Sequence, residues 1–232
     1  MQDGLCLRLR SVAELVRQGA VLADIGTDHA YLPLFLLTQG KIARAVCSDV
    51  NEGPLRSAKA NALALGFSEK ITFLLTDGLA GVLAHEPTDI AICGMGGELI
   101  ARILADAPEA HQGGLRFLLQ PMTRQETLRE KLCEMGFSVL SEVYTLEGDK
   151  AYLAMLCEYT GERRRACAAE CLLGARYFTP NAPMGAEERE YLLKKEKALL
   201  RRKNGRMAGG DDTAEEDVLL SLLDSLLHPK ES

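Results

Sequence analysis

Acidic residues and a glycine cluster where a short apolar run near the N-terminus gives way to a turn. The run 20–25 is followed by Gly26-Thr27-Asp28-His29, and a second apolar stretch begins at Tyr31. This order predicts a strand, a tight turn and a helix, which form the first βα unit of an open α/β sheet. A glycine at the strand end lets the backbone approach a ligand closely, because it carries no side chain. Asp24 and Asp28 lie on either side of this glycine, so the turn favours a cationic ligand over a pyrophosphate.

Two further apolar runs also end at acids. Asp49 closes the second run, 23 residues after Gly26, close to the offset of about 20 residues at which an acid accepts hydrogen bonds from an adenosine ribose. Asn51 follows it. The third run, 71–75, ends at Asp77-Gly78, where an acid can meet an adenine amino group. S-adenosylmethionine, with its ammonium and sulfonium charges, fits acids at three strand ends, although each acid alone is equally compatible with a structural role.

Apolar runs and helical patterns alternate along the first two thirds of the chain, which predicts a parallel, doubly wound sheet. Strands are expected at 20–25, 43–48, 71–75, 88–93 and 115–120, and helices at 5–18, 31–39, 54–65, 96–106 and 124–135. Thr123 and Glu126 form a T-x-x-E capping box that predicts the start of the last of these helices. The segments 137–146 and 151–159, joined by a turn, predict a terminal hairpin with an antiparallel strand. Class I methyltransferase sheets end in this way, whereas a six-stranded dehydrogenase sheet does not.

The remainder of the chain is helical and charged. Helices are expected at 162–178, 186–203 and 215–227, separated by prolines and glycines. The leucine stripe of the last helix needs a partner, which we expect to be the preceding helices in a coiled-coil-like hairpin. A homodimer seam is the alternative, and a monomer is the preferred prediction. We therefore divide the chain into residues 1–160, a ligand-binding α/β domain, and residues 161–232, a small helical domain.

Basic residues gather on the helix expected at 186–203. The formal net charge of −6 argues against a protein coated in nucleic acid, but a local basic face still permits phosphate contact. Lys194, Lys195, Arg201 and Arg202 lie on this helix with little compensating acid, and the acids follow at 211–217. A solvated helix face is the simpler explanation, but the segregation of charge favours an interaction surface.

Cysteine usage and hydropathy indicate a cytoplasmic protein. The seven cysteines form no C-x-x-C pair, and an odd count without paired spacing suits a reducing compartment. No metal site is expected, because Cys167 and Cys171 have no matching Cys or His pair. No membrane contact is expected either, because no run reaches the roughly 18 apolar residues of a membrane span and no secretory segment precedes the first helix.

Four motifs together resemble one family of RNA-modifying enzymes. ADIGTDHAYLP, SDVNEGPLRSAKANA, GMGGELIARIL and LQPMTRQETLREKL are similar to sequences of the bacterial tRNA adenine-N1 methyltransferases that act on adenine 22 of the D arm. The resemblance spans residues 5–160 and continues more weakly to the end. It implies a Rossmann-like class I domain that uses S-adenosylmethionine, an added helical C-terminal domain, and methyl transfer to N1 of an adenine in tRNA.

Candidate site residues follow from this combination. Cofactor binding is expected from residues at the carboxyl ends of the strands, namely Asp24, Gly26, Asp49, Asn51, Asp77, Gly78 and Gly94. Asp28 is the candidate that stabilises positive charge on the methylated base, and His29 is the candidate that accepts a proton or holds the turn. For the substrate, we expect Tyr31 to stack on the base and Gln120 to meet its edge. Phosphate contacts are expected from Lys194, Lys195, Arg201 and Arg202.

Three other functions fit parts of the sequence. A nicotinamide or flavin oxidoreductase needs G-x-G-x-x-G, but Asp28 occupies the place of the second glycine. A small-molecule methyltransferase would make the basic C-terminal helix incidental. A non-catalytic RNA-binding protein could keep the same fold, although the acids at three strand ends speak mildly against it.

Overall fold

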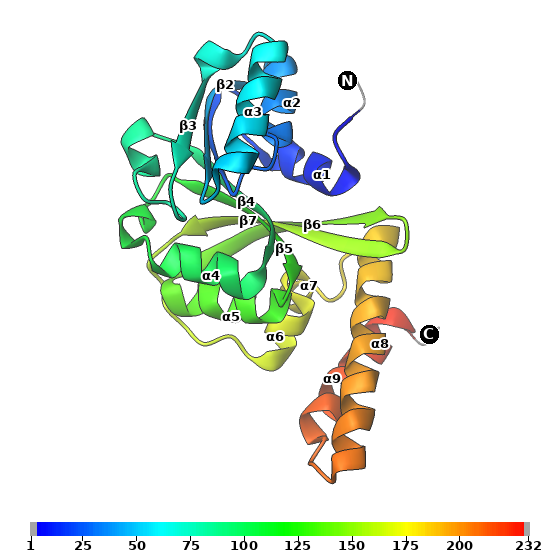
Figure 1. The fold of residues 1–232 in the computed structure, drawn as a ribbon. Coiled ribbons are helices and arrows are strands. Elements are labelled where there is room, and N and C mark those ends of the chain that lie inside the picture. Colours follow the sequence, from blue (N-terminus) through cyan, green and yellow to red (C-terminus); the bar gives the residue numbers. More distant parts are fainter. Residues whose placement is uncertain (1–3, 230–232) are drawn as a thin grey trace.

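A computed structural model describes residues 4–229 of the protein. The fold is built around one mixed sheet (Figure 1). Seven strands are hydrogen-bonded in the order β3-β2-β1-β4-β5-β7-β6. Their bounds are Ala20–Ile25 for β1, Ile42–Asp49 for β2, Ile71–Leu75 for β3, Asp89–Gly96 for β4, Arg116–Thr123 for β5, Phe137–Glu147 for β6 and Lys150–Tyr159 for β7. The first five strands run parallel, and β7 pairs antiparallel with both β5 and β6. The predicted parallel sheet with a terminal hairpin is therefore confirmed.

The strand order reverses next to β1, which pairs with β2 on one side and β4 on the other. Successive strand residues alternate between two buried faces. Leu22 and Ala91 belong to the core on one face, and Ala23 and Ile90 to the core on the other. Side chains of alternate residues point to opposite faces of a sheet, so apolar runs such as β1 and β4 require helices on both sides. The crevice at the reversal is where open α/β sheets bind ligands.

Five helices supply the two outer layers of this α/β unit. The core on one face includes residues of three of them, α1 (Leu7–Leu15), α2 (Tyr31–Thr38) and α3 (Glu52–Ala64). The core on the other face includes residues of α4 (Gly97–Ala105) and α5 (Gln125–Met135) and extends into the C-terminal helices.

The predicted capping box at the start of α5 is wrong. The helix begins at Gln125, after Arg124 in a left-handed conformation (φ 57°), and no side-chain hydrogen bond caps it. Thr123 remains in strand β5, paired with Gly96 of β4, so its hydroxyl is not placed at the helix N-terminus. Glu126 instead forms an ion pair with Lys195 at 2.7 Å.

The single helix predicted over 162–178 is also wrong. An extended segment precedes two short helices, α6 (Ala168–Leu173) and α7 (Ala175–Phe178), which are separated by Gly174 with φ 58°. A Cβ atom on Gly174 would lie 2.2 Å from a carboxylate oxygen of Glu142. The helix therefore breaks where the Glu142 side chain from β6 approaches the backbone.

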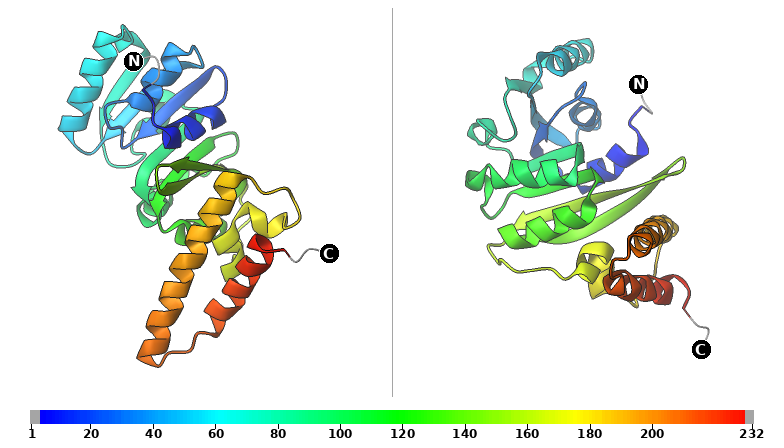
Figure 2. Two further views of the ribbon diagram at one scale, coloured as in Figure 1. Left: turned by 90° about the vertical axis from the view of Figure 1, so that its right-hand side faces the viewer. Right: turned by 60° about the horizontal axis from the view of Figure 1, so that its bottom comes forward.

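The last two helices form an antiparallel hairpin that projects from the sheet (Figure 2). Helix α8 (Ala186–Gly209) continues past the predicted end at residue 203, and α9 (Ala214–Leu227) returns along it. Gly205 lies inside α8, although glycine costs about 1 kcal/mol relative to alanine in a helix interior. Burial of Leu199 against α9 residues such as Leu223 favours the helix in spite of that cost. Among residues 4–229, no helix combines the length and apolarity that crossing a bilayer requires.

Candidate active site

A cavity of about 600 Å³ opens where the strand order reverses, at the carboxyl ends of β1, β2 and β4. Its walls bring together six of the predicted site residues, namely Asp24, Gly26, Asp28, Tyr31, Asp49 and Gly94. Three other predicted residues lie next to residues that line the cavity but do not line it themselves, namely His29, Asn51 and Gln120. Asp77 and Gly78 line a separate hollow of about 200 Å³ next to α4, so the structure does not join the third strand end to this cavity.

The glycine turn after β1 has the geometry that its sequence predicts. Gly26 has φ 70°, a conformation that glycine adopts without steric cost. The backbone N–H groups of Gly26 and Thr27 both donate to the carbonyl of Ser48 at 2.8 Å. This double contact fixes the turn against the end of β2, so the backbone of Gly26 forms part of the cavity wall.

Asp24 is a buried carboxylate in the floor of this cavity. Its side chain accepts a hydrogen bond from the Thr27 hydroxyl, and the residue is only 7% exposed. Burial raises the pKa of Asp24 to about 6; the Thr27 hydrogen bond opposes this shift, and the charge of Asp49 adds to it. Because burial disfavours the ionised carboxylate, a cation bound beside Asp24 would gain from pairing with it.

Asp49 ends β2 half-buried at the opposite wall. One of its oxygens, Oδ1, accepts a hydrogen bond from the backbone N–H of Asn51 at 2.7 Å. In residues 4–229, Oδ2 has no hydrogen-bond partner, and Asp49 lines the cavity. The exposed Asn51 is the N-cap residue of helix α3; its side chain forms no capping hydrogen bond and does not line the cavity.

Asp28, His29 and Tyr31 form the rim. His29 and Ala30 are consecutive left-handed residues, with φ 61° and 55°, an arrangement that costs energy for residues other than glycine and often marks functional sites. A hydrogen bond of 3.0 Å from the Asn61 amide to the His29 carbonyl supports it. The His29 ring lies 3.2 Å from Asp28 Oδ1 and stacks on Tyr31 with centroids 5.2 Å apart. The Asp28 side chain is 75% exposed, so the rim faces solvent.

Arg8 is a site residue that the sequence analysis did not place in the cavity. It projects from α1 into the cavity wall, and its Nη1 donates to Gln120 Oε1 at 3.0 Å. The backbone N–H of Gly94 donates to the same oxygen at 3.1 Å. Gln120 is fully buried and thereby fixes both Arg8 and Gly94. The helix predicted at 5–18 contains three arginines, but only the packing of α1 over the strand ends selects Arg8.

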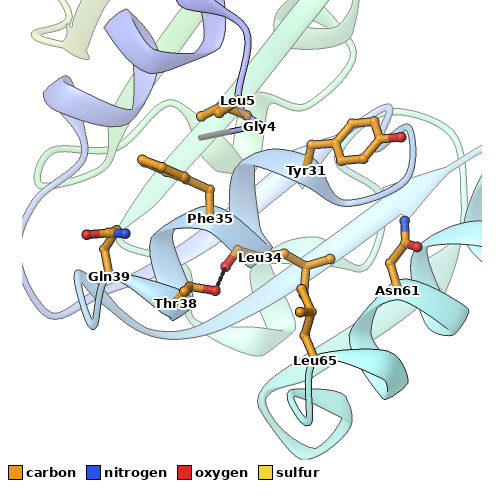
Figure 3. A pocket seen from close by; sticks show the side chains of 9 residues that line it. All are labelled: Gly4, Leu5, Tyr31, Leu34, Phe35, Thr38, Gln39, Asn61 and Leu65. Atoms are coloured by element: carbon orange, nitrogen blue, oxygen red, sulfur yellow. Dashed lines mark hydrogen bonds between the residues drawn. The ribbon is translucent and has the colours of Figure 1, made fainter. Parts of the chain in front are cut away.

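A second cavity, of about 440 Å³, adjoins the first and shares Gly4, Leu5 and Tyr31 with it (Figure 3). Phe35 and Leu65 are among the residues that line it. No carboxylate or basic side chain of the described chain lines this cavity. It is therefore a poorer match to a cationic nucleoside than the first cavity.

The predicted phosphate contacts on α8 are partly engaged within the protein. Lys195 Nζ lies 2.7 Å from Glu126 Oε1, and Arg202 Nε lies 2.9 Å from Glu216 Oε1. The expectation of little compensating acid is wrong for these two residues, because α9 and α5 bring carboxylates against α8. Lys194 contacts the Asp149 carbonyl and lies 3.5 Å from Glu190. Arg201 is exposed and forms no ion pair with any residue in 4–229.

Comparisons with known proteins agree with this site. A family model described as "Methyltransferase domain" matches residues 5–155. A tRNA (adenine(22)-N(1))-methyltransferase of Bacillus subtilis is 37% identical over 162 residues, which cover 70% of this chain and 68% of that protein.

Solved structures are similar over almost the whole chain. A Streptococcus pneumoniae protein, solved in complex with S-adenosyl-L-methionine, is 32% identical with a TM-score of 0.80 and coverage of 95% of this chain and 98% of that one. The B. subtilis m1A22 tRNA methyltransferase TrmK is 28% identical with a TM-score of 0.80, covering 96% and 98%. With its acid-lined cavity at the strand reversal and its helical C-terminal extension, this chain belongs to the class I methyltransferases, in the family of the tRNA (adenine(22)-N(1))-methyltransferases.

Proposed function

We propose that this protein transfers the methyl group of S-adenosylmethionine to N1 of adenine 22 in tRNA. The strongest support within the molecule is the charge pattern of the cavity of about 600 Å³, hereafter the main cavity. Asp24 and Asp49 place carboxylates there, where the strand order reverses. The B. subtilis relative is named for this reaction, and the S. pneumoniae structure holds S-adenosyl-L-methionine.

Individual residues of the main cavity match individual chemical groups of S-adenosylmethionine. Asp49 Oδ2 is available for the ribose hydroxyls, because Oδ1 already holds Asn51. The buried Asp24 would pair with the methionine ammonium, which would offset the cost of its burial. Arg8 has no carboxylate partner among residues 4–229, so its guanidinium is suited to the methionine carboxylate. The Gly94 backbone, with φ 76°, would allow close approach of the reacting end.

Methyl transfer to adenine N1 needs little general acid or base catalysis. S-adenosylmethionine supplies an activated methyl group whose sulfur leaves as a neutral thioether. The adenine N1 lone pair forms the new bond, so the protein contributes mainly alignment. The product base carries a positive charge, and Asp28 at the rim would stabilise that charge as it develops. His29 would accept the amine proton or hold the rim, and Tyr31 would stack on the base.

The target adenine must leave its stack to reach the cavity, so the rest of the tRNA must be held elsewhere. We assign this role to the domain of residues 161–232, in which Arg201 is one of the exposed basic residues of α8 that form no ion pair within residues 4–229. Lys194, Lys195 and Arg202 would contribute by exchanging internal partners for phosphates. The protein would act as a monomer in the cytoplasm.

Methyl incorporation into tRNA tests the proposal directly. Purified protein, labelled S-adenosylmethionine and an unmodified tRNA transcript should give labelled tRNA, and a transcript with guanine at position 22 should not be labelled. The Asp28→Asn variant should lower turnover more than cofactor affinity, because its proposed partner is charge on the base. Labelling of small metabolites but not of tRNA would identify a small-molecule methyltransferase. Binding of NAD in place of S-adenosylhomocysteine would identify an oxidoreductase, and tRNA binding without any transfer would leave an RNA-binding protein.

A further inference from the structure

Three metal-ligating side chains converge between the last two helices, outside the main cavity. Glu196 lies on α8, Asp224 lies on the last turn of α9, and His228 is the residue that caps that helix. One ligand atom from each residue lies within 4.8 Å of the other two. Asp224 and His228 are four residues apart, a spacing that puts both on one face of a helix.

The carboxylates of this cluster lack the basic partners that Glu216 and Asp217 of α9 possess. Glu216 is held by Arg202 and Arg206, and Asp217 is held by Lys203. Glu196 and Asp224 form no ion pair with any residue between 4 and 229. Two like charges this close repel each other unless a cation lies between them.

The end of α9 already binds one basic side chain, through its backbone and not through the carboxylates of the cluster. The last carbonyl groups of a helix carry partial negative charge, and the α9 C-terminus lies beside α8 (Figure 1). Arg189 of α8 already donates to the Leu227 carbonyl at 2.7 Å. That guanidinium binds the backbone and leaves both carboxylates of the cluster without a partner.

We propose that Glu196, Asp224 and His228 bind one divalent transition-metal ion of the zinc class, which clips α9 to α8. An imidazole with carboxylates suits Zn²⁺ and its first-row neighbours, and three protein ligands leave a position open to water. Bond lengths of about 2.0–2.2 Å require the ligand atoms to approach one another more closely than 4.8 Å. Glu196 is partly exposed and the other two are exposed, so small side-chain rotations suffice. The two carboxylates would neutralise the charge of the ion.

Calorimetric titration of Zn²⁺ into the tag-free, full-length protein after chelator treatment tests this site. We expect one equivalent to bind and the melting temperature of the protein to rise with Zn²⁺ concentration, because an ion that binds only the folded state stabilises it. Loss of an outer-shell partner alone costs about 10–100-fold in metal affinity, so His228→Ala and Asp224→Asn should each cost at least that much. Two variants, His85→Ala and Glu215→Gln, remove the same group types elsewhere and should leave the affinity unchanged.

Three results would overturn the proposal. One is the absence of saturable binding to the wild-type protein. Another is Zn²⁺ affinity that survives both His228→Ala and Asp224→Asn, or that Mg²⁺ matches, since Mg²⁺ does not select imidazole. The third is a thiolate charge-transfer band on Co²⁺ binding that disappears in Cys6→Ser or Cys167→Ser, which would assign the ion to cysteine. Methyl-transfer activity does not enter any of these measurements, so the outcome is independent of the proposed function.

Discussion

Buried charge is handled in opposite ways at the main cavity and at the junction between the sheet and the C-terminal helices. At the junction, the Arg129 guanidinium of α5 contacts Glu142 Oε1 at 2.7 Å, with side-chain exposures of 4% and 0%. Arg129 also donates to the Cys171 carbonyl at 2.7 Å. The other Glu142 oxygen accepts hydrogen bonds from the Tyr144 hydroxyl and the Ala175 N–H. The two opposite charges are therefore paired with each other inside the protein.

Inside the cavity, Asp24 and Arg8 have only neutral hydrogen-bond partners. Asp24 has the Thr27 hydroxyl, and Arg8 has the Gln120 amide. Neither charge is neutralised by an opposite charge within residues 4–229. The junction is thus complete as folded, whereas the cavity carries an acid and a base that a zwitterionic ligand would satisfy. The difference separates a structural ion pair from a binding site more clearly than burial does, since both regions contain buried charge.

The largest effect is expected from breaking the junction. Arg129→Ala would leave Glu142 buried without its cation, and removal of one partner of a buried pair costs about 3–5 kcal/mol. Chemical denaturation should report a fall of that size in the free energy of unfolding. Arg116→Ala is the matched control, because the Arg116–Glu158 pair is about one-third exposed at both ends, and such pairs contribute about 0.2–1 kcal/mol. Equal losses for the two variants would contradict the contrast drawn above.

The sequence predicts the cavity better than the junction, for a physical reason. Residues at the carboxyl ends of β1, β2 and β4 meet because the parallel topology brings strand ends together, so Asp24, Gly26 and Asp49 could be assigned from spacing alone. The contact between Arg129 and Glu142 joins α5 to β6 and depends on how those elements pack. The break at Gly174 follows from the same contact, so local helix propensity alone predicts one continuous helix there.

The ion-pair partners of the basic residues on α8 could not be predicted from the sequence either. The basic residues of α8 and the acids near α9 were visible as separate clusters, and their segregation favoured an exposed basic face. Only the return of α9 along α8 places Glu216 against Arg202. Arg8 was missed for a similar reason, because its role depends on the buried Gln120 on a different strand.

The second-largest effect concerns Asp24 and pH. Its pKa of about 6 lies above its ordinary value of 3.8, so the folded state binds the proton more tightly. The stabilisation from Asp24 is therefore present below pH 3.8 and is lost as pH rises to about 6, a change of about 3 kcal/mol. Asp24→Asn should then stabilise the cofactor-free protein above pH 6 and leave its stability almost unchanged below pH 4.

Cofactor binding should respond in the opposite sense. Because the cofactor ammonium prefers the ionised carboxylate, the affinity of the wild-type protein for S-adenosylmethionine should weaken as pH falls through 6. The Asp24→Asn variant should bind more weakly, with little pH dependence. His29→Asn, which removes the imidazole beside Asp28, should keep the wild-type pH profile. If the pH dependence of affinity were lost in His29→Asn and kept in Asp24→Asn, it would belong to His29, and the prediction for Asp24 would be wrong.

Two strand-end acids provide the third comparison. Asp49→Ala should weaken S-adenosylhomocysteine binding by about 1.5–3 kcal/mol, the usual contribution of a hydrogen bond to a charged group. Asp77→Ala should have a smaller effect, because Asp77 lines a different hollow. Calorimetry on both variants decides whether the cofactor extends to the third strand end. A loss at Asp77 equal to that at Asp49 would show that the two hollows join when the cofactor binds.

The smallest effect distinguishes paired from unpaired charges on α8. Arg201 is exposed and has no ion-pair partner in the described part of the chain, whereas Arg202 holds the fully buried side chain of Glu216. Arg201→Ala should therefore leave stability unchanged and lower the salt dependence of tRNA affinity by roughly one unit of log–log slope, the expected change for one lost phosphate contact. Arg202→Ala should lower the melting temperature and change that slope less, because Arg206 alone would then face Glu216. An unaltered slope in Arg201→Ala, with tRNA binding intact, would mean that this face of the hairpin does not touch tRNA. The basic residues of α8 would then serve chiefly to hold α9 in place.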